Sequence, residues 1–147
     1  IKLRTTFLVG FPGETQEDHK ALCRFVKQAK FDRVGVFEYS HEEGTRGYVL
    51  EDDVPAEVKK QRAEEIMAIQ QSISLAHNEA MIGKTLKVLI DRKEGGQYVG
   101  RSEYDSPEVD NEIWIDQTDK KLTPGSFVMV LITGASDYDL KGIPITK

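Results

Sequence analysis

The 147-residue sequence predicts an α/β unit followed by an all-β unit. Within the first forty residues, two β-prone runs flank one helical pattern, in the order strand, helix, strand. From Lys84 onward the apolar period changes from helical spacing to alternation, with Gly, Pro, Asp or Ser turns between short runs. We therefore expect residues 1–83 to be α/β and residues 84–147 to form a small five-stranded barrel.

The first strand is expected over residues 3–10, and the turn "GFPG" ends it. A helix to about Lys30 should follow, because Thr15 is a candidate N-cap and Asp18, three residues on, completes a capping box. Its apolar residues form one stripe, Leu22, Phe25, Val26 and Ala29. The second strand is expected over residues 33–40. Such a unit forms a parallel sheet, and the loops at the carboxyl ends of its strands are the usual binding edge.

A long second helix is expected from Pro55 to about Met81, where Gly83 can cap it. Its apolar residues recur three and four apart, which predicts one narrow buried seam with the Lys, Arg, Glu and Gln side chains facing away. The seam comprises Ile66, Ile69, Ile73, Ala76 and Ala80. Five runs then predict the barrel strands: "TLKVLIDR", "QYVGRSE", "NEIWID", "SFVMVLITGA" and "YDLKGIPI". Within the fourth run, "FVMVLI" is the best candidate for a strand packed on both faces.

Composition predicts a folded cytoplasmic protein, since 39% of the residues are hydrophobic and no apolar run is long enough to cross a membrane. The formal net charge of -5 argues against strong nucleic-acid binding and favours a basic protein partner. The sequence enters a strand pattern at its first residues, so we interpret it as part of a longer chain. One cysteine, Cys23, excludes an internal disulfide and a multi-cysteine metal site.

Four motifs together carry a family resemblance: "TTFLVGFPGETQEDHKAL", "FDRVGVFEYSHEEGT", "DDVPAEVKKQRAEEIMAIQQSIS" and "GKTLKVLI". In this order they resemble, across the whole chain, the C-terminal part of the radical S-adenosylmethionine methylthiotransferases. In that family the last two βα units of a partial (βα)6 barrel precede a small OB-like barrel called TRAM. The segments "YDSPEVDNEIWI" and "ITGASDYDLKG" are similar to the RimO-type enzymes, which act on a ribosomal protein rather than on tRNA.

The resemblance implies an enzyme that places a methylthio group on the β-carbon of an aspartate in small-subunit ribosomal protein twelve. It also implies S-adenosylmethionine and two four-iron four-sulfur clusters as cofactors of the whole protein. The three-cysteine cluster motif has no counterpart in this sequence. We therefore expect no cluster ligands in this chain, and we expect the chain alone to be inactive.

The resemblance also implies that the strand-end turn forms part of the S-adenosylmethionine pocket. The residues expected to bind this cofactor are Gly10, Phe11, Pro12, Gly13, Glu14, Phe37 and Tyr39. A glycine turn allows close approach of a ligand, but the same turn could serve packing alone. Glu14 could contact the ligand or could interact favourably with the dipole of the helix that follows.

Acidic residues of the barrel part are the candidate substrate contacts. Asp105, Glu108 and Asp110 could steer a basic partner, or they could form an acidic turn around Pro107 that caps strand ends. Trp114 and Tyr98 could stack on bases, but packing or protein contact is favoured, because stacking sites usually come with a basic groove and the chain has a net negative charge.

Two other functions stay open. One is a tRNA adenosine methylthiotransferase, for which basic residues of the barrel should converge on one face: Lys87, Arg92, Lys93, Arg101, Lys120 and Lys121. The other is a binding module without catalytic activity. Whatever the function, two parallel strands without the rest of the barrel have an exposed edge that could pair with a second molecule, which predicts self-association.

The three histidines are interpreted as surface residues. His41 belongs to a solvated loop, where the family commonly has proline, while His19 and His77 lie among charged neighbours with no second ligand at metal spacing. Cys23 is expected to be a buried helical thiol, because Leu22, Phe25 and Val26 surround it in the sequence.

Overall fold

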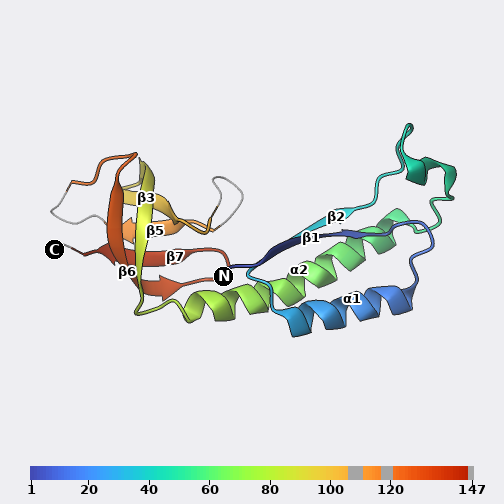
Figure 1. Cartoon of the computed structure of the whole chain (residues 1–147), viewed down its shortest axis with the longest axis horizontal. Coiled ribbons are helices and arrows are strands. Elements are labelled where there is room, and N and C mark those ends of the chain that lie inside the picture. The colour runs from blue at the N-terminus through green and yellow to red at the C-terminus, as the bar shows by residue number, and fades with distance from the viewer. Residues whose placement is uncertain (106–110, 117–120, 146–147) are drawn as a thin grey trace. The chain divides into compact units, whose positions relative to one another are not determined.

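The computed structural model describes residues 1–105, 111–116 and 121–145, and it divides into two compact units, Ile1–Ile73 and Ser74–Lys147. The elements of both units are labelled in Figure 1. Among the described residues, every helix is too short or too polar to cross a membrane. The predicted fold class, α/β followed by a small five-stranded barrel, is confirmed.

The first unit is a strand-helix-strand arrangement completed by a second helix. Its elements are β1 (Arg4–Val9), α1 (Gln16–Ala29), β2 (Arg33–Glu38), the 3-10 helix η1 (Arg46–Val49) and α2 (Ala56–Glu79), of which residues 74–79 belong to the second unit. β1 and β2 pair in parallel, and α1 and α2 cover one face of this sheet (Figure 1). Neither strand has a second strand neighbour among the described residues, so self-association through an edge stays a prediction.

Helix α1 begins as its sequence predicts. The Thr15 side chain accepts a hydrogen bond from the Asp18 N–H, and the Asp18 carboxylate accepts one from the Thr15 N–H, which completes the capping box. Val26 is fully buried, while Phe25 is half exposed and packs edge-on against Phe7 of β1. The predicted stripe thus faces the sheet.

Helix α2 differs from the predicted seam. Ile66 is fully buried, but Ala76 and Ala80 are exposed, and both lie beyond Ile73, where the first unit ends. The expectation that charged and amide side chains face away is wrong at three positions, Lys59, Arg62 and Gln70, which are all buried. These side chains are buried because each has a polar partner in the strand-end or interstrand loops.

The second unit is a closed barrel of five strands. In chain order they are β3 (Thr85–Glu94), β4 (Gln97–Ser102), β5 (Ile113–Asp116), β6 (Phe127–Ala135) and β7 (Leu140–Pro144). Around the barrel the order is β3-β4-β5-β7-β6, and only the β5–β7 pair is parallel. Residues from all five strands form its core: Val88, Ile90, Tyr98, Ile113, Ile115, Val130, Ile132 and Leu140.

Strand β6 is packed on one face, which corrects the expectation of burial on both. Phe127 and Met129 are 63% and 40% exposed, whereas Val130 and Ile132 are buried. The cause is closure, because a small barrel has one inner face and alternate side chains must point outward. Tyr98 is 3% exposed and its hydroxyl accepts a hydrogen bond from the Leu122 N–H, so packing is confirmed and base stacking is excluded for this ring.

Candidate functional site

The carboxyl ends of β1 and β2 meet at one edge of the sheet, as parallel strands require. Val9 and Glu38 are in register, and the Tyr39 N–H continues the pairing by donating to the Val9 carbonyl at 2.8 Å. The rings of Phe11 and Tyr39 then meet edge to face, with centroids 5.2 Å apart. Two predicted site segments that are distant in sequence therefore lie together at this edge.

Glycine is required at position 10 by its backbone conformation and by the proximity of a neighbouring helix. Its φ of +79° lies in the left-handed region that favours glycine. A Cβ at this position would collide with the side chain of Lys59 on α2. The Gly10 N–H donates to Glu14 Oε2 at 3.1 Å, and the Glu14 N–H donates to the Phe11 carbonyl at 2.9 Å. The turn is thus closed on itself.

Glu14 links this turn to α2. Its Oε1 accepts a hydrogen bond from Arg62 Nη1 at 2.7 Å, and the two side chains are 15% and 8% exposed. Both carboxylate oxygens of Glu14 therefore already have partners within the protein. Thr15, and not Glu14, is the N-cap of α1. Direct contact of Glu14 with a ligand stays a prediction, while its position as a link between the turn and α2 is explicit in the geometry.

Lys59 makes the matching link to the second loop. Its ammonium donates to the Tyr39 carbonyl at 3.2 Å and to Asp52 Oδ1 at 2.8 Å, and it lies 5.1 Å from the centre of the Tyr39 ring. Sequence reasoning missed both Lys59 and Arg62. A signal existed, because these two residues continue the three-and-four spacing that leads to Ile66. The pattern was read as a seam of apolar residues only.

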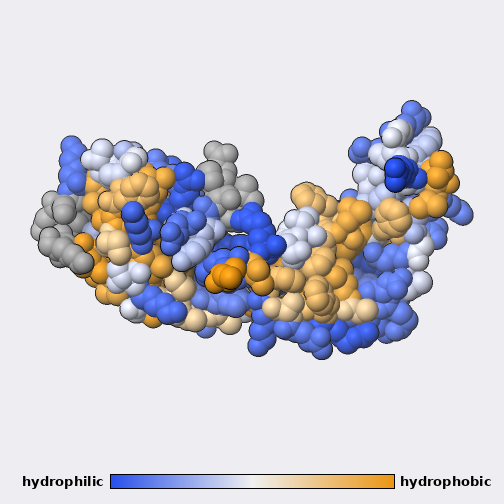
Figure 2. All heavy atoms as spheres, viewed as in Figure 1, coloured by the Kyte–Doolittle hydropathy of each residue, from blue (hydrophilic) through white to orange (hydrophobic). Residues whose placement is uncertain are grey.

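An apolar surface adjoins this edge on the sheet face opposite the helices. Leu8 and Phe37 are register neighbours and are 50% and 65% exposed, while Phe11 in the turn is 42% exposed. Pleating places Leu8 on the face opposite Phe7, which packs on α1. Hydrophobic side chains gather over this part of the first unit in Figure 2. Among the remaining predicted site residues, Pro12 is half-buried and the Gly13 N–H donates to Asp53 at 2.9 Å.

On the barrel, Asp105 closes the turn that follows β4. Its carboxylate accepts a hydrogen bond from Ser102 Oγ at 2.8 Å, and its N–H donates to the Ser102 carbonyl at 3.2 Å. It also lines a hollow of about 400 Å³ whose wall carries both signs of charge: Lys87, Leu89, Arg101, Ser102, Glu103, Asp105 and Phe127. The other two predicted substrate contacts, Glu108 and Asp110, lie outside the described residues.

Two arginine side chains of the barrel are paired with carboxylates. Arg92 contacts Glu94 and Glu112 at 2.9 and 3.1 Å, and these hydrogen bonds raise the pKa of its guanidinium. Arg101 lies 3.3 Å from Asp91. Such pairing lowers the positive potential that an RNA backbone would meet at these two residues. Of the remaining residues named for the tRNA alternative, Lys120 lies outside the described part of the chain.

His19 corrects the expectation of a surface residue. Its side chain is only 1% exposed, and its Nε2 lies 2.6 Å from Glu65 Oε2 and 3.5 Å from Cys23 Sγ. His19 and Cys23 are four residues apart on α1, so both face α2, and this spacing was the signal that went unused. Cys23 is half-buried, and burial together with the nearby Glu65 carboxylate raises the pKa of its thiol. His41 is exposed as expected, and His77 is half-buried.

Comparison with known proteins finds matches both to the barrel and to the chain as a whole. The TRAM domain family matches residues 82–145. The chain is 53% identical over 145 residues to the ribosomal protein uS12 methylthiotransferase RimO of Christiangramia forsetii. The aligned residues cover 99% of this chain and 32% of that protein. The proteins of the same name from Bacteroides thetaiotaomicron and Thermoanaerobacter sp. are 52% and 50% identical, each over 95% of this chain and 32% of their own length.

The chain therefore spans about a third of the length of the curated relatives that it matches. The resemblance drawn from the four sequence motifs is confirmed: this chain is similar over nearly its whole length to the ribosomal protein uS12 methylthiotransferases, and its barrel matches the TRAM domain family.

Proposed function

We propose that this chain is part of a radical S-adenosylmethionine methylthiotransferase that modifies the β-carbon of an aspartate in ribosomal protein uS12. The observation that carries the proposal is the 53% identity, over 99% of the chain, to a relative named as a uS12 methylthiotransferase. The activity is proposed for the whole protein. The chain alone is proposed to be inactive and to contribute one edge of a cofactor pocket and a substrate-binding barrel.

The strand-end site fits one part of S-adenosylmethionine. Exposed Phe37, Leu8 and Phe11 offer an apolar surface against which an adenine can pack. Lys59 and Arg62 of α2 hydrogen-bond to the two loops, so these residues preorganise the surface for a ligand. Together with a four-iron cluster, the cofactor supplies the radical that removes hydrogen from carbon. Because the sequence has one cysteine, which faces α2, we infer that both clusters are held by residues outside this sequence.

The barrel is the proposed recruiting surface for uS12. A basic partner is favoured by the net charge of -5 and by the acidic residues Glu103 and Asp105 beside an exposed Phe127. The tRNA alternative is less favoured because Arg92 and Arg101 are already paired with carboxylates. Glu108 and Asp110 remain proposed contacts from the sequence alone.

A chimera tests the enzymatic proposal. This chain replaces the matching third of the Bacteroides thetaiotaomicron protein in a strain lacking its own enzyme, and mass spectrometry then measures the methylthio group on uS12. We expect modification with the unaltered chain and a strong loss with Phe37→Ala. Met67→Ala, which removes another exposed apolar side chain but on α2, outside both proposed binding surfaces, should retain modification. A modified tRNA with unmodified uS12 would instead establish the tRNA enzyme.

Binding by the isolated chain tests the recruiting surface independently of catalysis. We expect the chain to bind purified uS12 more tightly than a tRNA anticodon stem-loop at about physiological salt. Asp105→Asn, combined with Glu108→Gln and Asp110→Asn, should weaken binding mainly through a slower on-rate. Glu94→Gln neutralises a carboxylate that does not line the hollow and is the matched control. Tighter binding of the stem-loop would overturn the partner assignment.

A further inference from the structure

Helices α1 and α2 bring three side chains with metal-binding atoms together, away from the strand-end site. His19 Nε2, Cys23 Sγ and a Glu65 carboxylate oxygen all lie within 4.8 Å of one another. His19 is 2% exposed, and its second ring nitrogen, Nδ1, has no hydrogen-bond partner among the described residues. Burying a ring nitrogen without a partner costs free energy, so packing of the two helices alone does not account for a histidine at this position.

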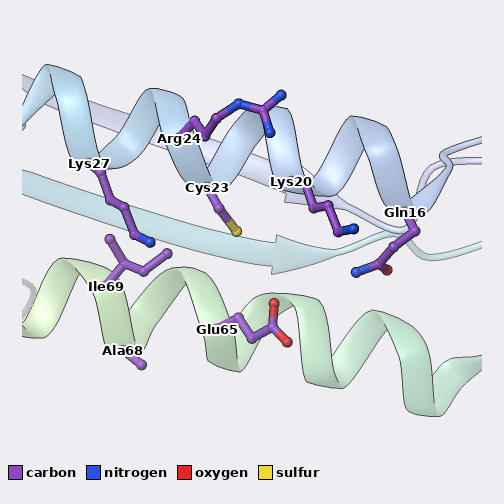
Figure 3. A pocket seen from close by; sticks show the side chains of 8 residues that line it. All are labelled: Gln16, Lys20, Cys23, Arg24, Lys27, Glu65, Ala68 and Ile69. Carbon is purple, nitrogen blue, oxygen red and sulfur yellow. The ribbon is translucent and has the colours of Figure 1, made fainter.

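The cluster opens onto a hollow of about 450 Å³ between the two helices. Figure 3 shows Cys23 and Glu65 reaching from facing helices toward the same space. The lining residues are Gln16, Lys20, Cys23, Arg24, Lys27, Glu65, Ala68 and Ile69. His19 is not among them, so it forms the deep end of the cluster. An ion can thus enter from solvent past Cys23 and Glu65 and meet the imidazole last.

The distances suit a tetrahedral ion. Metal–nitrogen and metal–sulfur bonds of about 2.1 and 2.3 Å place neighbouring ligand atoms roughly 3.3–3.6 Å apart. The His19–Cys23 separation of 3.5 Å already matches this range. The His19–Glu65 separation of 2.6 Å is that of a hydrogen bond and must widen. It can do so because the Glu65 side chain is 46% exposed and its carboxylate is free to retreat toward solvent.

We propose that His19, Cys23 and Glu65 bind a zinc ion, with His19 coordinating through Nε2 and the fourth position occupied by water from the hollow. One nitrogen, one sulfur and one oxygen ligand suit zinc and not magnesium or calcium, which prefer oxygen alone. Binding releases the thiol proton of Cys23 to solvent, and the neutral imidazole then carries its proton on Nδ1. A dication with one thiolate and one carboxylate is neutral overall, which makes it compatible with Lys20 and Lys27 in the lining.

Cobalt titration of the 147-residue chain tests the site, because cobalt reports thiolate coordination by near-ultraviolet charge-transfer absorption and tetrahedral geometry by intense visible bands. We expect one equivalent to bind and zinc to displace it. Cys23→Ser should abolish the charge-transfer absorption. Glu65→Gln and His19→Gln should each lower the affinity more than about tenfold, as expected for lost coordination. His77→Gln changes a half-buried histidine outside the cluster and should leave the titration unchanged.

Sedimentation during the titration distinguishes metal bound within one chain from metal that bridges two chains. The chain should stay in one association state while the absorption develops. Absorption that appears only with dimer formation, or that persists undiminished in His19→Gln, would mean that Cys23 binds metal without the proposed partners and would overturn the proposal. A folded chain that shows no absorption in excess cobalt would overturn it as well. Since Glu65 and Cys23 are partly exposed, their variants should fold even where His19→Gln does not.

Discussion

Replacing Glu14 with glutamine tests whether the turn is held by α2. Glu14→Gln keeps the size of the side chain and an oxygen for the Gly10 N–H, but it removes the negative charge from the Arg62 guanidinium. Arg62 is 8% exposed, so its charge cannot turn to water without unpacking α2. Breaking a buried pair by removing one partner costs roughly 3–5 kcal/mol. Because this pair retains slight exposure, we expect a loss of about 3 kcal/mol in the free energy of unfolding of the first unit.

A double-mutant cycle separates the pair from its surroundings. Arg62→Met removes the uncompensated charge, so the combination Glu14→Gln with Arg62→Met should cost less than the sum of the two single changes by about 2 kcal/mol. Glu17→Gln is the matched control. Its carboxylate is 80% exposed and 3.6 Å from Lys20, so the same substitution there should cost less than about 0.5 kcal/mol.

The two units can be followed separately in one denaturant titration. Far-ultraviolet circular dichroism reports mainly α1 and α2, while the fluorescence of Trp114, the single tryptophan, reports the barrel. Glu14→Gln should shift the helical transition and leave the fluorescence transition in place. Equal costs for Glu14→Gln and Glu17→Gln, or additive costs in the cycle, would refute the idea that this ion pair fixes the turn.

Three further predictions concern individual residues. Gly10→Ala should lower the free energy of unfolding by about 1–3 kcal/mol more than Gly13→Ala in the same denaturant titration. Both glycines have a positive φ, but only at Gly10 would a Cβ collide with Lys59. Equal losses would contradict this reasoning. Hydrogen bonds from Thr15 hold the pKa of Asp18 below its ordinary 3.8, so its contribution to stability is complete above that pH and is lost as the pH falls through the lower folded value. Asp18→Asn should therefore flatten the acid limb of the stability profile, and an unchanged limb would refute the role. Burial raises the pKa of the Cys23 thiol above 9.0, so alkylation by iodoacetamide at about pH 8 should be slower in the folded chain than in denaturant, and equal rates would contradict this.

Local signals in the sequence were sufficient for the two α-helices and the strands, although several ends lie a residue or two away and the 3-10 helix η1 was not expected. The Thr15 cap was predictable because both of its hydrogen bonds join residues three apart. Burial of Phe127 was expected from a run of consecutive apolar residues, although a small barrel has only one inner face and its alternate side chains must point outward. Burial of His19 and Lys59 was missed because it depends on how α1 and α2 pack, and charged or ionisable side chains are ordinarily found at the surface.

The same limit applies to the candidate site. Turn residues such as Gly10 and Glu14 were predictable from the motif, since a glycine turn after a strand is typical of ligand loops. The residues that hold the turn, Lys59 and Arg62, come from a helix more than forty positions later. Their spacing on that helix is compatible with the buried stripe, but cations were expected to face away, and only their partners in the loops explain why they are buried.

Because Lys59 is buried, the reactivity of its amine reports whether the strand-end loops are assembled. Its amine is capped by Asp52 and by the Tyr39 carbonyl, and its side chain is 8% exposed. An amine-reactive ester should therefore label exposed lysines such as Lys20 well before Lys59. Mass spectrometry of the labelled lysines then reads out, residue by residue, whether the loops are assembled, under conditions where neither spectroscopy nor catalysis can be followed.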